Sequence, residues 1–184
     1  MSYSYDKNHH QEPGGEVDVF EEYLKERGLK LTQARRDLLN LIFSNHDHFT
    51  ADELFDDCRK NEVRVSKATL YRTLTILLDC KLLVDHDFGE GSRYYEHVFG
   101  HRHHDHFFCT VCKEIIEFRS EKIEALQHEA ASELGFHPVR HTLAIFGVCA
   151  GCHETERGRA TIAEHKAAEL ESSKAKAVQS ESEA

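Results

Sequence analysis

Four of the six cysteines form two Cys-x-x-Cys pairs, Cys109 with Cys112 and Cys149 with Cys152. Two thiolates on one short turn can hold one ion, and two such turns complete a tetrahedral four-sulfur site that suits Zn²⁺. Because 36 residues separate the pairs, a metal bound there would join both ends of a domain. The alternatives are a redox-active pair, a disulfide framework and a rubredoxin-type iron site.

A histidine-rich run from His101 to His106 precedes the first cysteine pair and contains one carboxylate, Asp105. In an extended strand His103 and Asp105 would point to one face, and His104 and His106 to the other. The run therefore predicts two separate metal sites with mixed imidazole and carboxylate ligands, which suit Fe²⁺, Zn²⁺, Mn²⁺ or Co²⁺. The further ligands that the sequence offers are His48, Glu96, Glu117, Glu124 and His141.

The same run also matches the His-x-His-x-Asp-His ligand motif of metallo-β-lactamase-type hydrolases, in which a metal-bound water is the nucleophile. Such a hydrolase needs an upstream strand pattern, which residues 16–80 lack. The sequence also contains neither a nucleophile with an oriented base nor a glycine-rich phosphate loop. A solvated histidine tract is the remaining alternative. We therefore expect a metal-binding protein that is not an enzyme.

The chain has 184 residues, of which 40% are hydrophobic and 30% charged, and this predicts a soluble protein of one large or two small domains. Neither a membrane-spanning run nor a signal peptide is recognisable, so we expect no membrane association and a reducing cytoplasm, where paired cysteines bind metal. The net charge is −10, which by itself argues against binding to nucleic acid. The negative charge is unevenly distributed, however, because residues 21–84 hold 11 basic and 11 acidic residues and are neutral overall. Any contact with DNA must therefore be local rather than driven by overall charge.

Residues 16–96 are predicted to form four helices and a hairpin. Thr32, Thr50 and Ser66 are suited to cap three of the helices, and Glu53 completes a capping box with Thr50. The two strands of the hairpin are predicted at residues 82–84 and 93–95. Because helix, turn, helix and hairpin follow one another in a winged helix, we expect that fold here.

After residue 97 the pattern predicts strands on both sides of the first cysteine pair, a helix over residues 121–134 and a strand over 139–148. This second domain is therefore predicted to be small and α+β, and the whole chain belongs to the α+β class. Cys58 and Cys80 lie on apolar helical faces and are interpreted as core thiols.

Taken together and in this order, four motifs resemble the ferric uptake regulator (Fur) family of metal-dependent bacterial repressors. The motifs are Gly28-Leu29-Lys30-Leu31-Thr32-x-x-Arg35, Ala68-Thr69-Leu70-Tyr71-Arg72, His103-His104-Asp105-His106-x-x-Cys109-x-x-Cys112 and Cys149-x-x-Cys152. The resemblance covers roughly residues 20–153. It implies a cytoplasmic homodimer that represses transcription by binding palindromic double-stranded DNA operators when loaded with metal.

The expected segments are a disordered arm (1–15), a winged-helix DNA-binding domain (16–96), a metal-binding dimerisation domain (97–153) and a flexible acidic tail (154–184). The resemblance implies structural Zn²⁺ bound by Cys109, Cys112, Cys149 and Cys152. It implies a regulatory metal bound by His48, Glu96, His104, His106 and Glu117. It implies a second regulatory metal bound by His103, Asp105, Glu124 and His141. The expected DNA contacts are Lys30, Arg35, Ser66, Lys67, Thr69, Tyr71 and Arg72.

Fe²⁺ is the regulatory metal that the resemblance favours, with Zn²⁺ or Mn²⁺ as alternatives. Glu117 stands where peroxide-sensing members carry Asp, which favours a metal sensor over a peroxide sensor. The stretch between Glu96 and His104 is about one residue longer than in iron sensors, so His97 or His101 could replace Glu96 as a ligand. For DNA contacts, the alternatives are core packing of Tyr71 and a merely solvated Arg72.

Overall fold

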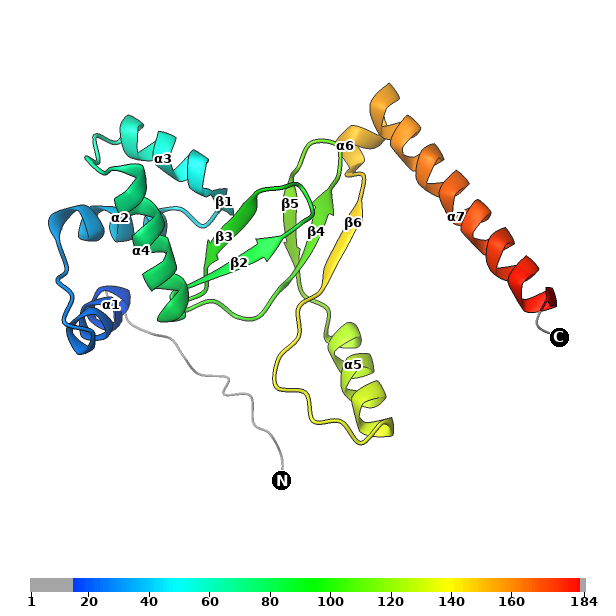
Figure 1. Cartoon of the computed structure of the whole chain (residues 1–184), viewed down its shortest axis with the longest axis horizontal. Coiled ribbons are helices and arrows are strands. Elements are labelled where there is room, and N and C mark those ends of the chain that lie inside the picture. The colour runs from blue at the N-terminus through cyan, green and yellow to red at the C-terminus, as the bar shows by residue number, and fades with distance from the viewer. Residues whose placement is uncertain (1–14, 183–184) are drawn as a thin grey trace. The chain divides into compact units, whose positions relative to one another are not determined.

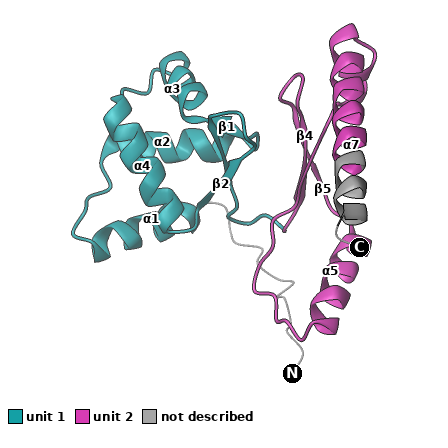
Figure 2. Ribbon diagram, turned by 45° about the vertical axis from the view of Figure 1, so that its right-hand side comes forward, with its two compact units in different colours: residues 1–102 teal, residues 103–184 magenta. Residues whose placement is uncertain are grey.

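The computed structural model describes the backbone of residues 15–182 and the side chains of residues 15–173. The chain divides into two compact units, residues 1–102 and residues 103–184, which Figure 2 distinguishes by colour. The predicted disordered arm lies outside the described residues except for Gly15, which begins the first helix. No helix within the described part is long and apolar enough to cross a membrane.

The first unit is a helical domain with a small antiparallel sheet (Figure 1). Its elements are α1 (Gly15–Glu26), α2 (Gln33–Ser44), β1 (Phe49–Thr50), α3 (Ala51–Lys60), α4 (Lys67–Asp79), β2 (Leu83–Asp87) and β3 (Arg93–His97). The strands are ordered β1-β3-β2, and β2 and β3 form the predicted hairpin. The predicted winged helix is therefore confirmed, with the short strand β1 as an addition that the sequence pattern did not reveal.

The predicted capping residues begin the helices. The Thr32, Thr50 and Ser66 side chains each accept a hydrogen bond from a backbone N–H three residues on. The Glu53 carboxylate in turn accepts a hydrogen bond from the Thr50 backbone N–H, which completes a capping box. Each such cap stabilises a helix by about 1 kcal/mol because it satisfies a backbone donor that has no helical partner. Together they fix where α2, α3 and α4 start.

The core of the first unit is formed by the apolar faces of its helices and by the start of β2. Its largest fully buried side chains are Phe20, Leu24, Leu38, Leu39, Leu70, Leu77, Leu82 and Leu83. Cys58 is buried in this cluster and Cys80 packs against it, which agrees with their interpretation as core thiols. Burial raises the pKa of both thiols, so they stay protonated at neutral pH.

The second unit consists of a three-stranded sheet with helices. Its elements are β4 (Asp105–Cys109), β5 (Ile115–Phe118), α5 (Glu121–Glu133), β6 (Ala144–Gly147), α6 (Ala150–His153) and α7 (Glu156–Ser182). The strand order is β5-β4-β6, with β4 antiparallel to β5 and parallel to β6. A parallel pair needs a long crossover, and α5 lies within it.

One expectation for the second unit needs correction. The strand predicted over residues 139–148 is confined to Ala144–Gly147, because only these residues pair with β4. Leu126 in α5 and Leu134 at its C-cap are 63% and 84% exposed. The predicted flexible tail, residues 154–184, is helical in α7 through Ser182, and its flexibility stays a prediction.

Candidate metal centres

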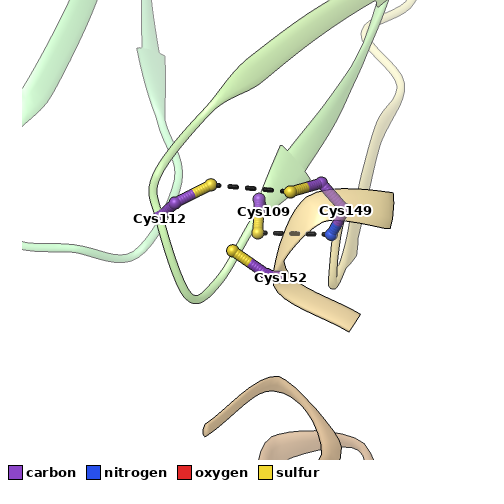
Figure 3. A group of neighbouring side chains, drawn as sticks. All are labelled: Cys109, Cys112, Cys149 and Cys152. Carbon is purple, nitrogen blue, oxygen red and sulfur yellow. Dashed lines mark hydrogen bonds between the residues drawn. The ribbon is translucent and has the colours of Figure 1, made fainter. Parts of the chain in front are cut away.

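The four cysteines of the two Cys-x-x-Cys pairs converge at one end of the sheet of the second unit (Figure 3). Cys109 ends β4, and Cys149 follows the end of β6. Because β4 and β6 run parallel, with Cys109 opposite Gly147, the two cysteine pairs lie at the same end of the sheet. The four sulfur atoms lie within 4.8 Å of one another. This cluster therefore has the donors and the spacing that a structural Zn²⁺ requires.

Two thiols of this cluster have strongly shifted pKa values. Burial acts to raise the pKa of Cys109, but backbone N–H groups of Cys112 and Cys149 outweigh it and lower the pKa to about 6. The Cys149 nitrogen lies 3.3 Å from the Cys109 sulfur. A hydrogen bond with Cys112 raises the pKa of Cys152 to about 12. Because Zn²⁺ binds thiolates, loading this cluster must release protons, above all from Cys152.

Gly158, a buried glycine near the start of α7, packs closely against the backbone of Cys152. A Cβ atom at Gly158 would overlap the backbone carbonyl oxygen of Cys152. We expect Gly158→Ala to weaken zinc retention and to destabilise the second unit by about 1–3 kcal/mol, the usual cost of overpacking. In an ordinary helix, by contrast, replacing glycine with alanine increases stability.

Competition with a chromophoric chelator, together with thermal unfolding, measures both effects of the Gly158 substitution. The matched control is Gly151→Ala in α6, where an added Cβ meets no atom within 4 Å. Equal zinc release from the two variants would contradict the role assigned to Gly158.

A second donor cluster lies within the second unit, between β4, α5 and the segment that precedes β6. The His103 and His141 Nε2 atoms are 2.7 Å apart. Each lies 3.4–3.7 Å from Asp105 Oδ1 and from Glu124 Oε1. Asp105 is 1% exposed and neither of its oxygens has a hydrogen-bond partner among the described residues. An uncompensated buried carboxylate is costly, and a bound divalent cation would satisfy it.

The other face of β4 carries a different donor set. His106 is buried directly after Asp105 on the strand, and its ring centroid lies 5.0 Å from that of His104. His104 Nε2 lies 3.7 Å from Glu117 Oε1, and Glu117 is opposite His106 on β5. Neighbouring residues on a strand point to opposite faces, so the second unit keeps two histidine sets apart.

In the first unit, Glu96 on β3 is held between two histidines. Its Oε2 lies 2.7 Å from His48 Nε2, and its Oε1 lies 3.1 Å from His86 Nε2. Glu96, rather than His97 or His101, is therefore the residue that β3 presents to His48. The sequence analysis did not identify His86 as a neighbour of Glu96. The register of the hairpin could have indicated it, because Glu96 pairs with Val84 and His86 then lies diagonally across from Glu96.

The residues predicted to contact DNA gather at α4 and around the start of α2. Tyr71 is 48% exposed on α4, which excludes the alternative of core packing, and Arg72 beside it is also exposed. Ser66 caps α4 by accepting from the Thr69 N–H. Two of the predicted side chains already have protein partners: Lys67 pairs with Asp52 at 2.9 Å, and Arg35 donates to the Lys30 backbone carbonyl at 2.7 Å.

The chain is similar in sequence to ferric uptake regulators. The model of the ferric uptake regulator family matches residues 26–146. The ferric uptake regulation protein of Rhizobium leguminosarum bv. viciae is 38% identical over 130 residues, which cover 71% of this chain and 91% of that protein.

Two solved structures extend the comparison to the fold. The Helicobacter pylori ferric uptake regulator, described as having three functional metal-binding sites, matches with a TM-score of 0.72 and 25% identity over 77% of this chain and 94% of its own. A zinc-bound manganese uptake regulator matches with a TM-score of 0.57 and 37% identity, over 71% and 98%. Proteins named for iron and for manganese are thus both among the similar chains.

Proposed function

Because this chain belongs to the ferric uptake regulator family of metal-responsive transcriptional regulators, we propose that it is an iron-responsive repressor that binds DNA when its regulatory site is loaded. The observation that carries this proposal is the separation of donors by type. The four-cysteine cluster is suited to a permanent Zn²⁺, whereas the histidine and carboxylate sets are suited to exchangeable cations such as Fe²⁺. The protein is a regulator and not an enzyme.

We propose that the regulatory metal is shared between the two units. His48 and Glu96 would supply imidazole and carboxylate donors from the first unit, and His104, His106 and Glu117 would supply donors from the second. The segment between β3 and β4, residues 98–104, connects the two units. Shared coordination would remove the freedom of this connection and set the spacing of two copies of α4 on DNA. The cluster of His103, Asp105, Glu124 and His141 would hold a second regulatory ion within the second unit alone.

A second candidate is a manganese- or zinc-responsive regulator, which the likeness to a manganese uptake regulator favours. Imidazole and carboxylate donors suit Mn²⁺ and Zn²⁺ as well as Fe²⁺. Glu117, which replaces the Asp of peroxide sensors, weighs against peroxide sensing. Anaerobic titration of DNA binding with Fe²⁺, Mn²⁺ and Zn²⁺ separates these candidates, because only the cognate ion should act at its cellular concentration.

The proposed partner surfaces are α4 and the apolar side chains of the second unit. Tyr71 and Arg72 would reach base edges or phosphates from α4 in the major groove. The second unit exposes several large apolar side chains, which support a homodimer because monomers rarely expose so many. These side chains are Leu126, Leu134, Phe136, Val139 and Phe146. A dimer would read two half-sites of a palindromic operator.

Binding to duplexes selected from a random-sequence pool tests the proposed function. We expect high affinity with Fe²⁺ or Mn²⁺ present and loss of affinity when a chelator removes the exchangeable ions. Tyr71→Ala should lower the affinity about tenfold, since one base contact contributes about 1–3 kcal/mol. The matched control is Thr75→Ala, an exposed position one turn further along α4. Equal affinity with metal and with chelator would refute a metal-dependent repressor.

A further inference from the structure

Three histidines of the first unit form a cluster that the proposed function does not use. They are His46, His97 and His101, and each offers a ring nitrogen within 4.8 Å of the others. The ring centroid of His97 lies 4.9 Å from that of His46 and 4.5 Å from that of His101. His46 and His101 are stacked at 5.2 Å. Imidazoles that converge in this way have the arrangement of metal ligands rather than of separate surface side chains.

Three different segments bring these histidines together. His46 lies in the loop between α2 and β1, and His97 is the last residue of β3. After β3 the chain turns back, because the His101 N–H donates to the Val98 carbonyl at 3.1 Å and Gly100 adopts a φ of 78°. This turn places the His101 ring against His97, so the cluster follows from the fold and not from one flexible loop.

His97 is the buried member of the cluster and its ring is fixed by packing. It is 5% exposed, and its ring lies 4.7 Å from the Phe43 ring. Neither of its ring nitrogens has a hydrogen-bond partner among the described residues. Buried polar groups nearly always have a partner, since leaving one without costs about 1–3 kcal/mol. The missing partner is what a bound cation would supply.

A packed core histidine is the alternative interpretation of His97. It would not explain why the His46 and His101 rings both lie against the His97 ring.

We propose that His46, His97 and His101 form a three-imidazole site for a divalent cation of the Zn²⁺, Co²⁺ or Ni²⁺ class. Three histidines leave a fourth position for water or another ligand. A site without carboxylates disfavours Mg²⁺ and Ca²⁺, and the general order of affinities places Ni²⁺ and Zn²⁺ above Mn²⁺ and Fe²⁺. The site would therefore prefer Co²⁺, Ni²⁺ or Zn²⁺ to the Fe²⁺ and Mn²⁺ proposed for regulation.

The position of this site on β3 separates it from the donors around Glu96. Glu96 and His97 are consecutive on β3 and point to opposite faces of the strand. Glu96 contacts His48 and His86, whereas His97 contacts His46 and His101. A cation held by the three histidines would tie the segment after β3 to the loop between α2 and β1. This inference does not depend on DNA binding or on the regulatory metal.

Anaerobic cobalt titration of the full chain, loaded with its structural zinc, tests the proposal. The bound Co²⁺ is counted by metal analysis after gel filtration. We expect the double variant His46→Ala/His101→Ala to bind one Co²⁺ fewer per chain than the wild-type chain, or to bind it at least tenfold more weakly. His97→Phe should have the same effect, and its aromatic ring keeps the packing against Phe43, so this variant stays folded.

The matched control is His128→Ala/His137→Ala, which removes two exposed histidines outside all of the donor clusters. Unchanged Co²⁺ stoichiometry and affinity in both the double variant and His97→Phe would overturn the proposal. An equal loss of Co²⁺ in the control would overturn it too, because the ion would then bind to surface histidines in general. His48→Ala should still bind the Co²⁺ attributed to the three histidines.

Discussion

Cys109→Ser should lose the structural zinc and unfold the second unit while the first unit stays folded. A structural Zn²⁺ contributes about 10–16 kcal/mol of apparent folding free energy, which equals or exceeds the about 5–15 kcal/mol that stabilises a typical domain. The second unit has little else to replace it. Among the described residues, its only buried apolar side chains are those of Phe108 and Cys109 itself.

The first unit should be unaffected because it has its own core. It contains 15 of the buried hydrophobic residues among those described, and 14 of them form one core cluster. Hydrogen exchange distinguishes the two units directly. In Cys109→Ser we expect protection to disappear in β4, β5 and β6 and to remain in α2 and α4. Removing zinc from the wild-type chain with a strong chelator should produce the same pattern.

Cys80→Ser is the matched control for this result, because it makes the same chemical change at a cysteine outside the zinc cluster. It should keep one zinc per chain and lose at most about 1–2 kcal/mol of stability from the first unit. If Cys109→Ser kept stoichiometric zinc and normal exchange protection, the four-cysteine cluster would not be the element that holds the second unit together.

His48→Ala should weaken metal-dependent DNA binding about a hundredfold without changing the zinc content. Shifting a two-state equilibrium almost completely takes about 5.5 kcal/mol of differential affinity, and the loss of one ligand should remove about half of it. His48 is 2.7 Å from Glu96 and both side chains are almost fully buried. Glu96→Gln should therefore have an effect of similar size, since it keeps the shape and removes the charge.

Fluorescence anisotropy of an operator duplex, titrated with protein at saturating Fe²⁺ or Mn²⁺ under anaerobic conditions, measures this loss. The residual affinity in chelator should be the same for His48→Ala and the wild-type chain, because the variant affects only the loaded state. Exposed His128 provides the matched control through His128→Ala. Wild-type operator affinity in His48→Ala at saturating metal would exclude a metal shared between His48 and the second unit.

Local signals in the sequence predicted local structure well. Thr32, Thr50 and Ser66 marked helix starts because an N-cap depends on contacts only three residues away. The division of His103, Asp105, His104 and His106 between two donor sets likewise follows from the alternation of side chains along a strand. Helical periodicity also placed Leu126 on α5, but it shows which residues share a face and not whether another element covers that face, and Leu126 is 63% exposed.

The sequence alone determined which donor types are available, the capped helices and the family, since residue identity and short spacings are properties of the chain itself. Only the tertiary structure decided that Glu96 rather than His97 faces His48 and that His86 joins them. It also decided that His46, His97 and His101 converge, and that Gly158 leaves no room behind Cys152. These relations depend on strand register and on turns that bring distant segments together, and no spacing within a single segment contains that information.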